Sequence, residues 1–166
     1  LIFDCDGVLV NSEELAQQVE LTCLAEIGLR YEREEFVHLF SGMPTTRFRD
    51  AIASEHIDKL GEKIPSWFFD YMFSNVVSAY EKDLEAIHGA VEFARSWEKL
   101  KAVASSGSPD LIAMKLAKAG LGQIFGDCVF CSQDLQPKPS PEVFLFAAEK
   151  LGIEPSNCLV IEDSIS

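Results

Sequence analysis

Long apolar runs and positive charge are both scarce in this sequence. No apolar run approaches the ~20 residues that span a membrane, and nothing resembles a secretory signal peptide. There are 14 Lys and Arg residues against 27 Asp and Glu residues, a formal net charge of −13. Proteins that bind nucleic acid need basic surfaces to displace the counterions of phosphates. We therefore expect a cytoplasmic protein that binds neither membranes nor nucleic acid, and the sequence does not predict its oligomeric state.

Cysteine is too scattered for a disulfide framework, since the five residues are odd in number and irregularly spaced. Cys128 and Cys131 form a C-x-x-C pair, a pattern found in zinc and redox sites. The segment reads as a strand, however, on which residues three apart face opposite sides. No second pair is available to complete a zinc site. We expect buried, reduced cysteines with a structural role.

The first part of the chain, over residues 13–85, is predicted to be helical. One helix is expected to begin at Asn11 or Ser12 and to stop at Gly28, and others are expected over 45–60 and 66–84. The last of these helices has an apolar stripe at helical spacing, which favours a helix–helix core. The stripe consists of Phe69, Met72, Phe73, Val76 and Tyr80.

Strands alternate with helices in the rest of the chain. The segments "KAVASS", "CVFCS" and "NCLVIED" read as strands, and the two helices between them begin with Ser-Pro-acid and end at Gly. This alternation predicts an α/β fold, a Rossmann-like doubly wound parallel sheet. We expect residues 1–12 and 86–166 to form this core and residues 13–85 to be an inserted helical cap. The sequence stops at "VIEDSIS", from which we expect the C-terminal part of the core to be missing.

Polar residues stand at the carboxyl end of every predicted strand. They are Asp4 and Asp6 after the first strand, Ser105, Ser106 and Gly107 at the second, Lys138 after the third, and Glu162 and Asp163 after the fourth. Ligands of parallel α/β sheets bind at this edge. Carboxylate oxygens suit Mg²⁺, while a lysine, a hydroxyl and free amides suit a phosphate. The pattern favours phosphoryl transfer, in which one carboxylate is the nucleophile and a second moves protons.

Four segments resemble, in order, the motifs of the haloacid dehalogenase-like hydrolase superfamily, in its phosphoglycolate phosphatase and β-phosphoglucomutase branch. They are "DCDGVLVNSE", "VASSGS", "PKPSPEVF" and "VIEDS". The resemblance implies that Asp4 is the nucleophile and a metal ligand. It implies that Asp6 is the general acid and base and binds Mg²⁺ through its backbone carbonyl. Glu162 and Asp163 would complete the metal site.

The same resemblance implies how a phosphate is held. Ser105 and Lys138 would contact it directly, helped by the amides of Cys5, Asp6 and Ser106, with Gly107 in the same loop. Arg47, in the cap loop over residues 41–49, is the candidate for a second anionic group of the substrate.

The choice among reactions of this superfamily favours a hydrolase. Asp6 argues against a dehalogenase, and the cap loop has no lysine for a phosphonatase-like Schiff base. A phosphosugar mutase would prefer histidine where the chain has Ala16. We expect a Mg²⁺-dependent phosphatase that acts on a small phosphorylated metabolite, such as a sugar phosphate, through an aspartyl phosphate. A β-phosphoglucomutase-like mutase and a non-catalytic phosphate-binding module are the alternatives.

Overall fold

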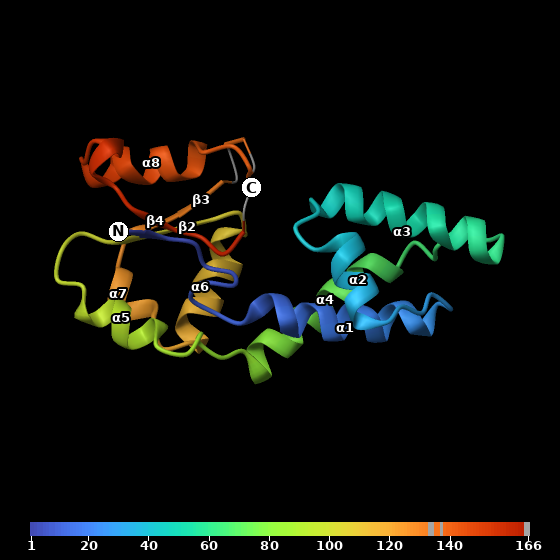
Figure 1. Cartoon of the computed structure of the whole chain (residues 1–166). Coiled ribbons are helices and arrows are strands. Elements are labelled where there is room, and N and C mark those ends of the chain that lie inside the picture. Colours follow the sequence, from blue (N-terminus) through green and yellow to red (C-terminus); the bar gives the residue numbers. More distant parts are fainter. Residues whose placement is uncertain (133–134, 137, 165–166) are drawn as a thin grey trace. The chain divides into compact units, whose positions relative to one another are not determined.

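The computed structural model describes residues 1–132, 135–136 and 138–164. The chain divides into two compact units (Figure 1). The first, which we call the α/β unit, contains Leu1–Glu13 and Tyr80–Ser166. The second, the helical unit, contains Glu14–Ala79.

The α/β unit is built on a parallel sheet of four short strands in the order β3-β2-β1-β4. The strands are β1 (Ile2–Phe3), β2 (Ala102–Ser105), β3 (Val129–Cys131) and β4 (Val160–Ile161). β1 pairs with β2 and β4, and β2 pairs with β3. The strand order reverses at β1, because β2 and β3 follow on one side and β4 lies on the other. The predicted α/β fold with a parallel sheet is confirmed.

Helices pack on both faces of this sheet (Figure 1). On one face, α8 (Glu142–Leu151) places Val143, Ala147 and Ala148 against Ile2 and Ala104. The other helices of the unit are α5 (Ala90–Ser96), α6 (Pro109–Lys118) and α7 (Gly122–Phe125), and a 3₁₀ turn covers Pro155–Asn157.

The opposite face of the sheet carries Phe3, because successive side chains of a strand point to opposite sides. Its ring meets Phe93 of α5 and Phe125 of α7 edge to face, with centroids 6.0 and 5.6 Å apart. β1 is therefore covered on both faces by apolar side chains.

The predicted boundaries of α6 are confirmed. The hydroxyl of Ser108 accepts a hydrogen bond from the amide of Leu111 at 3.4 Å, and Pro109 is the first helical residue. The chain leaves the helix through Gly120, whose φ of +72° suits glycine.

The helical unit is formed by four helices, of which the first and last extend into the α/β unit. They are α1 (Ser12–Glu26), α2 (Arg33–Phe40), α3 (Thr45–Leu60) and α4 (Phe68–Asp83). The sequence did not predict α2. A cluster of aromatic rings fills the core of the unit, in which Phe40 meets Phe36 and Phe48 at centroid distances of 5.1 and 5.3 Å.

The apolar stripe of α4 differs from the prediction at its start. Phe68 is fully buried, whereas Phe73 is 54% exposed. Phe68, Met72, Val76 and Tyr80 form the buried face at a spacing of four residues. The prediction therefore missed Phe68 and was wrong for Phe73, whereas Phe69 is partly buried and packs against the same core.

The five cysteines are all free thiols. Cys5 and Cys23 are buried, as predicted, but Cys128, Cys131 and Cys158 are only half-buried. The prediction was wrong for these three because β3 and β4 are the edges of the sheet. Among the described residues, no helix has both the length and the apolar character needed to cross a membrane.

Candidate active site

The loop after β1 places Asp4 at the carboxyl edge of the sheet. The Asp4 amide donates to the carbonyl of Ile161 at 2.9 Å, which ties the ends of β1 and β4 together. The loop then turns back, and the carbonyl of Cys5 accepts from the amides of Leu9 and Val10 at 2.9 and 3.1 Å. The side chains of Asp4 and Cys5 are both buried.

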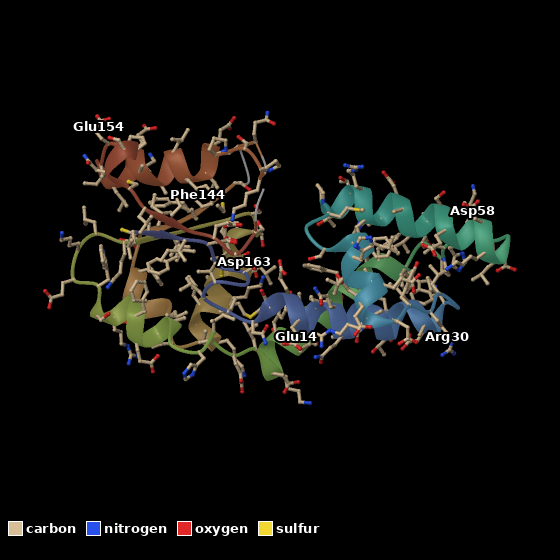
Figure 2. The ribbon with its side chains drawn as sticks, viewed as in Figure 1. Glu14, Arg30, Asp58, Phe144, Glu154 and Asp163 are labelled. Atoms are coloured by element: carbon tan, nitrogen blue, oxygen red, sulfur yellow. The ribbon has the colours of Figure 1, made fainter. Side chains whose placement is uncertain are left out.

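Lys138 bridges two acidic residues that come from different strands. Its Nζ lies 2.8 Å from Oδ1 of Asp4 and 2.9 Å from Oε2 of Glu162. It also lies 4.8 Å from the ring centroid of Phe144, which belongs to α8 (Figure 2). The loop between β3 and α8 thus delivers one ammonium group to the carboxyl ends of β1 and β4.

Three carboxylates lie close together at the same edge of the sheet. Asp4, Glu162 and Asp163 each offer an oxygen, and these oxygens lie within 4.8 Å of one another. Asp163 is marked in Figure 2 on the loop after β4. Gly7 makes room for it, because a Cβ at Gly7 would lie 2.0 Å from Oδ2 of Asp163.

The cluster has the character of a site for a hard divalent cation. Its donors are all carboxylate oxygens, the ligands that Mg²⁺ prefers. Oδ1 of Asp4 is buried and accepts no well-directed hydrogen bond from the described residues, although Lys138 lies close by. A buried oxygen left in this way can accept a cation. The residues present therefore fit the expected metal.

Burial dominates the electrostatics of Asp4. It raises the pKa of this carboxyl from 3.8 to about 7, although Lys138 and the backbone hydrogen bond of Cys5 act in the opposite direction. The nearby charge of Glu162 raises the pKa further. Burial thus outweighs the effect of Lys138 on the pKa of Asp4.

Asp6 points to a different set of partners. Its Oδ1 accepts a hydrogen bond from the hydroxyl of Ser12 and forms an ion pair with Nζ of Lys115. Sequence analysis did not single out Lys115. The available signal was a lysine between apolar residues of one helix, close to the buried Ile112 and Leu116.

The end of β2 and the loop after it contain three of the predicted phosphate-binding residues, Ser105, Ser106 and Gly107. Ser105 is fully buried, and its hydroxyl lies 3.3 Å from the amide of Gly107, from which it accepts a hydrogen bond. Ser106 is exposed. The carbonyl of Ser105 accepts from the amide of Ser132, which joins the ends of β2 and β3.

Arg47 lies in the helical unit, where it is an exposed residue in the first turn of α3. Its assignment to the substrate stays a prediction. Gln136 and Lys138 are described on the loop before α8, whereas Pro137 between them lies outside the described residues.

A parallel sheet that gathers carboxylates and a lysine at its carboxyl edge is typical of α/β enzymes that bind anionic ligands there. The family model of the haloacid dehalogenase-like hydrolases matches residues 1–166, and the chain belongs to this family. The predicted superfamily and the predicted enzyme class, a hydrolase with phosphatase relatives, are confirmed.

Two relatives from Escherichia coli (strain K12) carry phosphatase names. The chain is 27% identical to 6-phosphogluconate phosphatase, over 100% of this chain and 74% of that protein. It is 30% identical to fructose-1-phosphate phosphatase YqaB, over 99% of this chain and 86% of that protein.

A solved structure is similar in both fold and sequence. It is a hydrolase of the same family from Deinococcus radiodurans R1, with bound phosphate and sodium. The match has a TM-score of 0.81 at 32% identity and covers 98% of this chain and 71% of that one.

Proposed function

We propose that the protein is a Mg²⁺-dependent phosphatase that hydrolyses a sugar phosphate or a similar small phosphomonoester through an aspartyl phosphate. The observation that carries this proposal is the position of Lys138. It joins Asp4 to Glu162 beside Asp163, at the strand ends where a parallel sheet binds its ligands. The site thus combines a nucleophile, an ammonium group for phosphate and ligands for a cation.

Asp4 is the nucleophile in this proposal. A carboxylate oxygen of Asp4 forms a bond to phosphorus while the bond from phosphorus to the leaving oxygen breaks. Its neighbour Lys138 balances the negative charge of the phosphoryl group, and Ser105 together with the amides of Cys5, Asp6 and Ser106 binds the remaining oxygens, with Gly107 in the same loop.

Asp6 moves the protons. It gives a proton to the leaving oxygen in the first step, and in the second it takes a proton from the water that attacks phosphorus. This second attack breaks the bond between phosphorus and Asp4 and restores both carboxyl groups.

Asp4, Glu162 and Asp163 would hold Mg²⁺, and the backbone carbonyl of Asp6 would add a further ligand. When bound, the cation neutralises charge between the carboxylates and the phosphate. Gly7 serves this arrangement by leaving space for Asp163.

The names of two relatives support the proposed substrate class. These relatives are named for the phosphates of a sugar and of a sugar acid. We further propose that the helical unit, Glu14–Ala79, is the cap that selects the substrate and that Arg47 contacts its anionic part.

The test measures phosphate release from fructose 1-phosphate and 6-phosphogluconate, with Mg²⁺ and with a chelator. We expect release that requires Mg²⁺ and a loss of about a thousandfold or more in kcat for Asp4→Asn. Asp127→Asn, an exposed aspartate of the α/β unit, is the matched control and should keep its activity. Full activity of Asp4→Asn would contradict the proposed mechanism, and no release from a wider set of phosphomonoesters would contradict the function.

A further inference from the structure

Lys115 is a charged side chain in a closed, largely apolar environment. Only 5% of it is exposed, and it follows the buried Ile112 by one turn of α6. Its Nζ pairs with Oδ1 of Asp6 and lies 4.7 Å from the ring centroid of Tyr80. An ammonium group at such a place needs a partner, because burial without one is costly. Asp6 supplies the opposite charge.

Two donors from separate elements converge on the same oxygen of Asp6. Lys115 comes from α6, and the buried hydroxyl of Ser12 comes from the first residue of α1. Two directed contacts on Oδ1 fix both the direction and the plane of the carboxylate. The Asp6 side chain is still 28% exposed, so the carboxyl group can be reached from solvent.

We propose that Lys115 is a positioning residue for the proton-transfer step. It holds Oδ1 of Asp6 so that Oδ2 faces the leaving oxygen of the substrate. The inference rests on the proposed function, which assigns proton transfer to Asp6. Lys115 itself contacts neither the phosphate nor the reacting atoms in this proposal. Lys138 remains the lysine that contacts the phosphate.

The consequence is a dependence on the leaving group. A sugar alkoxide must be protonated as it leaves, whereas p-nitrophenolate is a stable anion that leaves without a proton. A misplaced Asp6 therefore slows the first reaction far more than the second. The ratio of kcat/KM for fructose 1-phosphate to kcat/KM for p-nitrophenyl phosphate reports this difference.

The experiment compares Lys115→Met and Lys115→Gln with wild-type protein in the presence of Mg²⁺. Each variant lacks the charge and keeps most of the buried chain. We expect the ratio to fall by about 10- to 100-fold, within the range of general acid catalysis. Lys118→Met is the matched control one turn along α6. Lys118 donates to the carbonyl of Lys82, and its variant should keep the wild-type ratio.

Two further measurements separate positioning from a purely structural role. Thermal unfolding shows which Lys115 variants are folded. The ratio of kcat/KM values measured for a folded variant tests the inference. In an Asp6→Asn background, Lys115→Met should not change the ratio further, because the residue acts through Asp6.

An unchanged ratio in a folded Lys115 variant of an active enzyme overturns this inference and leaves the proposed function intact. A further fall of the ratio in the Asp6→Asn background also overturns it. If fructose 1-phosphate is not a substrate, the ratio is measured with a sugar phosphate that the wild-type protein hydrolyses. Wild-type protein that releases phosphate from none of a wider set of phosphomonoesters overturns the proposed function, and the inference with it.

Discussion

Burial and the charge of a neighbouring lysine act in opposite directions on Asp4. Its side chain is 8% exposed, and burial raises its pKa to about 7. Lys138 lowers this pKa, whereas the nearby charge of Glu162 raises it. A second positive charge at the cluster would favour the ionised form of Asp4. The protonation of this one carboxyl group is therefore coupled to folding and, in the proposed function, to metal binding.

Metal-free protein should lose stability as the pH rises. Because the folded-state pKa of Asp4 lies above the unfolded value of 3.8, folding binds a proton between about pH 4 and 7. The stability that this gives is complete below the unfolded pKa and is lost as the pH rises through 7. Asp4→Asn removes this titration. We expect its unfolding midpoint, relative to wild type, to be higher at pH 8 than at pH 4.5 in the presence of a chelator. An equal difference at both pH values would contradict the raised pKa.

Gly7 should not tolerate a side chain. A Cβ at this position meets Oδ2 of Asp163 at 2.0 Å, and the φ of +74° is unfavourable for other residues. We expect Gly7→Ala to weaken Mg²⁺ binding by at least about tenfold, as does the loss of a supporting group in other metal sites. Calorimetric titration with Mg²⁺ measures it.

The control for this variant is Gly152→Ala. Gly152 has a φ of +68° and no atom within 4 Å of its Cβ position, so it shares the backbone penalty without the clash. If both variants bound Mg²⁺ like wild type, the space beside Asp163 would have no role in the metal site.

At the scale of elements, α6 connects several parts of the α/β unit. Its N-terminus follows the loop of Ser105, its middle contributes Lys115 to Asp6, and Lys118 near its end binds the carbonyl of Lys82 in α4. A change that frays the start of α6 should therefore lower the free energy of unfolding of the protein.

Ser108→Ala should destabilise the protein by about 1 kcal/mol, because it removes the N-cap of α6. Ser108→Asp keeps an acceptor for the amide of Leu111 and should retain most of the stability. Urea denaturation of both variants measures the effect. Equal stability of Ser108→Ala and wild type would show that the 3.4 Å contact contributes nothing.

At the scale of the whole molecule, the parts that sequence predicts are those set by local pattern. The alternation of strands and helices indicated the parallel sheet, and Ser108 and Pro109 marked the start of α6. The rule that ligands bind at the carboxyl ends of parallel strands also indicated Asp4 and Lys138. In the structure Nζ of Lys138 lies 2.8 Å from Oδ1 of Asp4. The residue types at strand ends are readable because a parallel sheet gathers them at one edge.

What the sequence did not predict depends on contacts between distant segments. Lys115 looks like one more residue of an amphipathic helix until the fold places it against Asp6. The space that Gly7 leaves for Asp163 is likewise visible only when β1 and β4 are paired. Helix α2 was missed because it is short, with eight residues, and its buried Phe36 and Phe40 give only a brief periodic signal.

The pairing of β1 with β4 also sets the order in which the site can be made. Asp4 directly follows β1, whereas Glu162 and Asp163 follow β4, which comes after β1, β2 and β3 in the chain. Contacts between segments so far apart in sequence form slowly, since a long loop must close first. During synthesis Asp4 is therefore present long before Glu162 and Asp163. A growing chain can form the helical unit and the pair β1–β2 early, and the carboxylate cluster is completed only when β4 docks beside β1.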